Sequence, residues 1–125
     1  MTPLIFLLLA VAGGVGAAVR FLVDGLIRAR LKTAFPWATT IINASGSLVL
    51  GFLTGLTLVH LLPSDLSVIL GTGFLGGYTT FSTASYETVQ LIKQGRHAAA
   101  FTSGVVMLVI CVALAALGLW WGSSI

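Results

Sequence analysis

The chain has 125 residues, of which 58% are hydrophobic and only 7% are charged, and its formal net charge is +3. A soluble domain carries about 25% charged residues, so this composition excludes an ordinary soluble protein and indicates one domain, residues 1–125, of an integral membrane protein. The basic balance does not indicate a nucleic-acid partner, because all six Lys and Arg residues lie at or between the ends of apolar stretches, where they set topology.

Four apolar stretches predict four membrane-spanning helices, since about 20 residues cross a bilayer. In chain order we expect helices over Leu4–Val23, Ala38–Leu62, Leu66–Ile92 and His97–Gly122. A basic linker leads to the second helix, a tight turn at Pro63–Asp65 leads to the third, and a short loop at Lys93–Arg96 leads to the fourth. The predicted fold is therefore an all-α membrane protein.

The first apolar stretch has a second interpretation as a secretory signal, because Ala10 and Ala12 form an A-x-A pattern after an apolar core. A signal also needs Lys or Arg before that core, and none is present. A membrane span is therefore favoured.

Small residues recur four positions apart in three of the predicted helices. The pairs are Gly13/Ala17, Gly51/Gly55 and Gly73/Gly77. Such spacing lets helix backbones approach closely, so we expect a tightly packed bundle. The alternative is that membrane helices are simply rich in glycine.

The basic residues fall on one side of the predicted membrane. They are Arg20, Arg28, Arg30, Lys32, Lys93 and Arg96, whereas the loop on the other side carries Asp65 and no Lys or Arg. Cytoplasmic loops are enriched in Lys and Arg. We therefore expect a multi-pass protein of the cell's inner (plasma) membrane with both termini outside.

Motifs typical of enzymes are missing or misplaced. The segment Gly71–Gly76 reads G-x-G-x-x-G but lies in an apolar span, without the preceding strand that a dinucleotide site needs. His60, His97 and Cys111 are too scattered to predict a metal site. The protein is therefore not expected to be an enzyme.

The stretch GGYTTFSTAS, residues 76–85, is unusual inside an apolar span. Two glycines followed by two threonines form helix poorly, so we expect the third helix to be broken in mid-membrane, as in many ion and substrate sites. Exposed carbonyls there suit a cation, and hydroxyls suit an anion; these hydroxyls belong to Thr79, Thr80, Ser82 and Thr83. The alternative is that each hydroxyl bonds only to a carbonyl one turn back.

Four other residues are candidates for an anion path. Asn43 offers amide donors, or else an interhelical hydrogen bond. Phe81 offers a positive ring edge, or else packing. Arg20 attracts anions to a pore mouth, or else extends to the lipid headgroups. Glu87 is buried near a vestibule, or else meets water at the helix end.

The chain resembles the Fluc (CrcB) fluoride channel family along its whole length. The resemblance lies in GGYTTFSTAS, in GVGAAVRF of the first helix, in TTIINASG around Asn43 and in LGLW near the C-terminus. It implies a four-helix subunit in an antiparallel dimer with fluoride pores and a structural Na⁺ at the interface. The resemblance also implies that the protein gives the cell resistance to fluoride.

The resemblance also assigns roles to individual positions. Carbonyls of Gly76 and Thr79 would bind the Na⁺. The fluoride path would pass Asn43 and Phe81 and run near Thr39, Ser82 and Thr83, with Arg20 at a vestibule and Glu87 beside it.

Three features depart from the family pattern. Ala84 stands where a second pore phenylalanine is usual, and Met107, Cys111 and Ala115 replace a hydroxyl-bearing track on the fourth helix. The six-to-none charge bias also disfavours insertion in both orientations, which a homodimer of antiparallel subunits needs. These departures favour a heterodimer with an oppositely inserted paralogue, although self-pairing stays possible.

Two further functions stay open on sequence. The chain could be a non-conducting structural partner in a heterodimeric channel, which Ala84 favours. It could instead be a small four-helix drug exporter, but such a protein needs an acid inside its first helix, and the first acid here is Asp24 at the end of that span.

Overall fold

A computed structural model describes residues 2–125, which form an all-helical bundle without a β-strand. Three helices are long and apolar enough to cross a membrane. They are α1 (Pro3–Arg30), α2 (Trp37–Leu58) and the continuous run of α6 (His97–Phe101), the π-helical η2 (Thr102–Val106) and α7 (Met107–Ser123). These three match predicted spans and indicate a multi-pass membrane protein.

The remaining apolar stretch is divided into two shorter helical segments. The first consists of α3 (Ser64–Ser67), the π-helical η1 (Val68–Leu75) and α4 (Gly76–Tyr78), and the second is α5 (Ser82–Lys93). Residues 79–81 between them are not helical. Neither segment is long enough on its own to count as a membrane span.

Both boundaries of the first predicted linker differ from expectation. Helix α1 continues beyond Val23 to Arg30, because Asp24 and Arg28 form an ion pair one turn apart that supports further helix. Helix α2 begins one residue early at Trp37. The basic linker predicted from the sequence is therefore largely helical.

Helix α2 ends at Leu58, short of the predicted Leu62. His60 adopts a positive φ of 61°. The N–H of His60 donates to Thr57 and the N–H of Leu61 donates to Leu56, at 3.1 and 2.9 Å. This pattern of two bonds around a left-handed residue is the Schellman motif, which closes a helix C-terminus.

Glycines bring the helix backbones into direct contact. A Cβ added to Gly51 would lie 2.0 Å from the carbonyl oxygen of Ala115 in α7, and one added to Gly77 would lie 2.0 Å from that of Gly13 in α1. No side chain larger than hydrogen fits at either place. The prediction of a tightly packed bundle from the small-residue spacing is confirmed.

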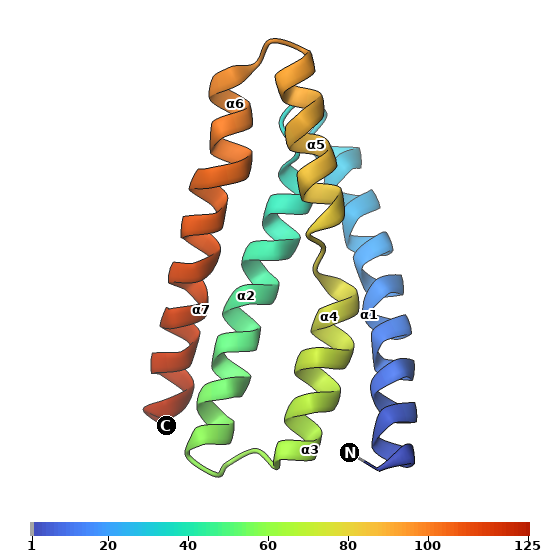
Figure 1. Ribbon diagram of the computed structural model, residues 1–125, viewed down its shortest axis with the longest axis vertical. Helices are drawn as coiled ribbons and strands as arrows, with labels where there is room; N and C mark the ends of the chain where they lie inside the picture. The colour runs from blue at the N-terminus through green and yellow to red at the C-terminus, as the bar shows by residue number, and fades with distance from the viewer. Residues whose placement is uncertain (1) are drawn as a thin grey trace.

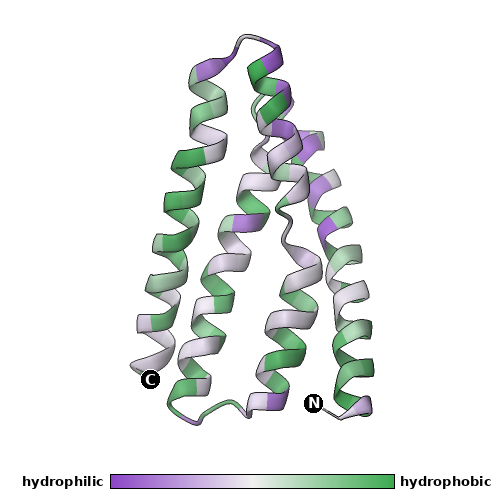
Figure 2. Cartoon of the chain, viewed as in Figure 1, coloured by the Kyte–Doolittle hydropathy of each residue, from purple (hydrophilic) through white to green (hydrophobic). Residues whose placement is uncertain are grey.

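Across the view in Figure 1, the helices lie side by side in the order α7, α2, α3 to α4, and α1. Both termini lie at one end, and the α1–α2 and α5–α6 connections lie at the other. Figure 2 shows hydrophilic residues gathered toward that second end, while the helices below it consist mostly of hydrophobic and weakly polar residues. Exposed side chains such as Phe21, at 78%, and Trp120, at 67%, suit a lipid environment.

Candidate functional site

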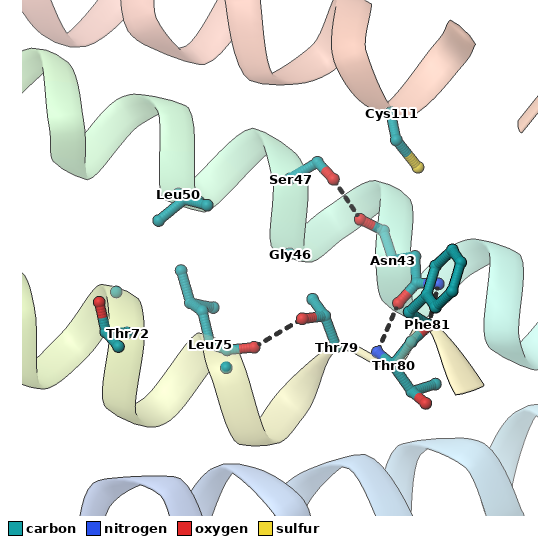
Figure 3. A pocket seen from close by; sticks show the side chains of 12 residues that line it. Asn43, Gly46, Ser47, Leu50, Thr72, Leu75, Thr79, Thr80, Phe81 and Cys111 are labelled. Atoms are coloured by element: carbon teal, nitrogen blue, oxygen red, sulfur yellow. Dashed lines mark hydrogen bonds between the residues drawn. The ribbon is translucent and has the colours of Figure 1, made fainter. Parts of the chain in front are cut away.

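The chain leaves the helix between α4 and α5, directly opposite Asn43 of α2. The Asn43 amide pairs with the backbone of Thr80 at both ends: Nδ2 donates to the Thr80 carbonyl at 2.7 Å, and the Thr80 N–H donates to Oδ1 at 2.9 Å. Figure 3 shows the two residues facing each other. Backbone groups without partners are costly in lipid, so Asn43 stabilises the non-helical conformation.

Several backbone carbonyls at the end of α4 lose their usual donors at this point, where residues 79–81 are not helical. In an α-helix the carbonyl of residue i accepts from the N–H of residue i+4. The Thr80 N–H, which would reach Gly76, donates to Asn43 instead. The Thr83 N–H, which would reach Thr79, donates to the Thr80 hydroxyl at 3.2 Å. The carbonyls of Gly76 and Thr79 are therefore among those that lose an N–H donor to a redirected bond.

The hydroxyl of Thr79 points back along its own helix. It donates to the carbonyl of Leu75 at 2.8 Å, and the Thr79 N–H donates to the same oxygen at 2.8 Å. This is the bond to a carbonyl one turn back that threonine often forms in helices. The Thr79 hydroxyl proton is thus not available to an anion.

A cavity of about 450 Å³ adjoins the interruption. Asn43, Thr80 and Phe81 line one end of it, together with Gly76, and Cys111 approaches from α7. Figure 3 shows the Cys111 thiol directed toward Asn43. The Phe81 side chain is 86% exposed in the single chain, so its ring is free to contact another subunit or an ion.

A second cavity, of about 320 Å³, lies on the α1 side of the interruption. Arg20, Asp24 and Arg28 of α1 line it with Thr39 of α2, and Thr80 and Thr83 also belong to its polar wall. Thr80 lines both cavities. The interruption therefore separates two hollows, one of which carries two guanidinium groups.

A charged network adjoins the second cavity, which two of its members, Asp24 and Arg28, line. Arg28 Nη2 donates to Glu87 Oε2 at 3.0 Å, and Arg28 Nε donates to both carboxylate oxygens of Asp24 at 2.9 Å. The other oxygen of Glu87 accepts from the hydroxyl of Thr39, which is buried. The Glu87 side chain is 17% exposed, compared with 47% for Arg28. Glu87 is thus held between α1 and α2.

The structure brings most of the residues singled out from the sequence to these two cavities. The first holds Asn43, Phe81, Gly76 and Thr79, the second holds Arg20, Thr39 and Thr83, and Thr80 belongs to both. Ser82 is exposed at the start of α5, with its hydroxyl 3.4 Å from that of Thr80. Glu87 touches the second cavity through Thr39.

Sequence reasoning missed Arg28 as a site residue. Asp24 and Arg28 stand at the i,i+4 spacing of a helical ion pair, and that signal was available. Their contact with Glu87 was not, because 59 positions separate Arg28 from Glu87 and only the packing of α5 against α1 and α2 brings them together.

The positions that depart from the family pattern take packing roles or line the first cavity. The Ala84 carbonyl accepts from the Thr88 hydroxyl at 2.8 Å, and that hydroxyl lies 3.2 Å from Ser103 of η2. Ala115 contacts the Gly51 backbone. Cys111 is half-buried at the first cavity.

Comparison with known proteins places the chain in a family. Residues 7–119 match the family model described as CrcB-like protein, Camphor Resistance (CrcB). The chain belongs to the CrcB family. It is 53% identical over 122 residues to "Fluoride-specific ion channel FluC 1" of Leifsonia xyli subsp. xyli, an alignment that covers 98% of this chain and 89% of the relative.

Two further relatives carry similar names. The chain is 41% identical over 120 residues to "Fluoride-specific ion channel FluC 2" of Mycobacterium bovis, covering 96% of this chain and 92% of the relative. It is 40% identical over 113 residues to "Fluoride-specific ion channel FluC" of Syntrophotalea carbinolica, covering 90% and 92%. These matches confirm the family resemblance drawn from GGYTTFSTAS and Asn43.

Proposed function

We propose that this chain is a subunit of a fluoride-selective ion channel, through which fluoride leaves the cytoplasm passively. The main structural support is the double hydrogen bond between Asn43 and Thr80, which holds a non-helical segment between two cavities. The chain's relatives are named fluoride-specific ion channels. Membership of this family removes the basis for a drug exporter.

The donors left free at the interruption suit a small, strongly hydrated anion. Asn43 has a second N–H that the Thr80 carbonyl does not use, since an amide carries two. Ser82 and Thr83 offer hydroxyls, and the Phe81 ring edge carries partial positive charge. Fluoride gives up water only where such donors replace it, so we place the fluoride path along these residues. Arg20 attracts the ion to the mouth.

A structural Na⁺ at the carbonyls of Gly76 and Thr79 fits the residues present. Hard cations prefer oxygen ligands, and redirection of the Thr80 and Thr83 N–H groups leaves these two oxygens available. A Cβ built on Gly76 meets no neighbour within 4 Å, so a second subunit has room to approach. The cation would fix the broken backbone and add positive charge beside the anion path.

We further propose that α3 to α5 together make the third of four membrane crossings, broken in its middle, and that both termini lie on the outer side of the plasma membrane. The connections that carry Lys and Arg share one end of the bundle (Figure 2), which the positive-inside rule assigns to the cytoplasm. A negative-inside potential drives anions outward. Neutral HF that enters and ionises would therefore leave as fluoride, which gives fluoride resistance.

The proposed assembly is an antiparallel dimer. The favoured partner is an oppositely inserted paralogue, and the alternative partner is a second copy of this chain. The charge bias fixes one orientation for each chain, and relatives named FluC 1 and FluC 2 fit proteins that occur in pairs. Ala84 and Cys111 also favour a second candidate function, a non-conducting subunit that supports its partner's pore.

Fluoride efflux from liposomes tests these proposals, with chloride as the control ion. Selective efflux from vesicles that contain only this chain would show a working homodimer. Efflux that appears only after co-reconstitution with an oppositely oriented paralogue would establish the heterodimer. In that case, substituting Phe81 and Asn43 in this chain alone decides whether its own path conducts. Silence in both preparations would overturn the channel function.

A further inference from the structure

Glu87 places a negative charge beside a path that we assign to an anion. Glu87 does not itself line the second cavity, but its carboxylate is held by two residues that do, Arg28 and Thr39. Because the Glu87 side chain is only 17% exposed, water screens this charge poorly. A carboxylate in that position would repel fluoride unless another group offsets its field.

Arg28 is the group that offsets it. One guanidinium contacts both Asp24 and Glu87, and Arg20 is the other cation of the cavity. These two cations and two carboxylates leave the cavity neutral overall, with Arg20 forming no ion pair within residues 2–125. Loss of Arg28 alone would leave a net negative cavity.

The position of Arg28 suits a role at the entrance. Arg28 lies about 37 Å along α1 from Pro3, at about 1.5 Å per residue, whereas the hydrocarbon core is about 30 Å thick. The ion pair is thus at the water interface, where incoming ions meet the field of the cavity. Salt screens such a field over about 10 Å at 0.1 M.

We propose that Arg28 is a positioning residue for fluoride entry: it neutralises Glu87, so that the second cavity stays neutral overall and Arg20, which forms no ion pair within residues 2–125, can draw anions into it. This inference rests on the proposed channel function. It predicts that flux depends on the charge balance of Arg28 and Glu87, more than on the presence of either side chain.

The test is fluoride efflux at low and high ionic strength, with whichever liposome preparation conducts for the parent chain. Arg28→Gln should slow efflux roughly tenfold at low salt, the lower range of electrostatic steering, and less at high salt. Arg28→Lys should retain most of the flux. Arg30→Gln is the matched control, because it removes the same charge two residues along α1 from a side chain that forms no ion pair within residues 2–125.

The double variant Arg28→Gln/Glu87→Gln separates charge from structure. It restores the neutral cavity, so its efflux should return toward that of Glu87→Gln alone. An equal loss from Arg28→Gln in both backgrounds would overturn the inference, as would a loss insensitive to salt. If Glu87→Gln alone abolishes efflux, the comparison of Arg28→Lys with Arg28→Gln takes the place of the double variant. Equal fluoride efflux from these two variants would overturn the inference. A silent parent in every preparation would instead overturn the channel function, and this inference with it.

Discussion

Asn43 and Thr80 hold each other through two hydrogen bonds of 2.7 and 2.9 Å, one to each backbone polar group of Thr80. A side-chain amide thus replaces the helical partners of a residue that has left the helix. The sequence left two roles open for Asn43, an interhelical hydrogen bond and a donor to an anion. The arrangement allows both, because the amide braces the bundle and still keeps one N–H for an anion.

Asn43→Ala should destabilise the protein and abolish fluoride flux. The change removes both bonds and leaves the Thr80 N–H and carbonyl unpaired, at a cost of about 1–3 kcal/mol for each buried group. Thermal unfolding in detergent micelles and liposome efflux measure the two effects. Thr57→Ala is the control, since its hydroxyl bonds only to the carbonyl of Leu53 one turn back in the same helix. Equal unfolding temperatures for the two variants would contradict the bracing role of Asn43.

Gly77→Ala should destabilise the bundle by about 1–3 kcal/mol, the usual cost of overpacking, because its Cβ would lie 2.0 Å from the Gly13 carbonyl oxygen. Gly14→Ala is the matched control: it adds the same methyl group to α1 where nothing lies within 4 Å, and it should stabilise by up to about 1 kcal/mol through helix propensity. Chemical or thermal unfolding of both variants checks the prediction. A stability of Gly77→Ala at or above the parent's would refute the close contact.

Phe81→Leu should reduce fluoride efflux strongly while leaving the unfolding temperature nearly unchanged. The ring is 86% exposed, so its loss removes little packing in the subunit, whereas an aliphatic side chain lacks the positive edge of an aromatic ring. Phe6→Leu, at a position 63% exposed in α1, controls for loss of an exposed ring. Undiminished efflux from Phe81→Leu would remove this ring from the ion path.

Much of this arrangement could be predicted from the sequence. The two threonines, Thr79 and Thr80, lie where the helix is interrupted, as their low helix propensity predicts. The double glycine before them was expected to break the helix too, but Gly76 and Gly77 lie in the helical turn α4. Apolar length predicted α1, α2 and the run from His97 to Ser123. The extension of α1 to Arg30 was missed because a charged segment reads as a linker, whereas the Asp24–Arg28 pair keeps it helical.

Other features depend on tertiary packing and could not be predicted. The contact of Arg28 with Glu87 forms only when α5 packs beside α1 and α2. The choice of Thr80 as the partner of Asn43 depends on the relative rotation of α2 and the interrupted segment, which hydropathy does not encode. The Schellman motif at His60 requires a left-handed residue, and the sequence there lacks the glycine that usually marks this position.

Replacement of Na⁺ by a large organic cation should lower the unfolding temperature of the assembled dimer. A ligand that binds only the native state stabilises it by about 2.7 kcal/mol at one hundred times its Kd, and the carbonyls of Gly76 and Thr79 supply the proposed ligands. Titration of Na⁺ into choline buffer at constant ionic strength measures the effect, with K⁺ and Li⁺ as comparisons. An unfolding temperature that is the same in all four cations would contradict a bound Na⁺.

Reporter fusions should place both termini outside the cytoplasm. The two connections that carry basic residues lie together at the end of the bundle opposite the termini (Figure 1). Lys32 and Arg96 lie in these connections, and the other four Lys and Arg residues lie on the helices that lead into them, so the charge bias sets a fixed orientation. A C-terminal alkaline phosphatase fusion, which is active only outside the cytoplasm, should therefore be active, and a green fluorescent protein fusion exported by the same route should be dark.

Replacing Lys93 and Arg96 with Gln while adding two Lys next to Asp65 should shift part of the population to the reverse orientation, because the bias then falls from six against none to four against two. Fluorescence of the parent fusion would show cytoplasmic termini. It would also remove the charge argument for an oppositely inserted paralogue.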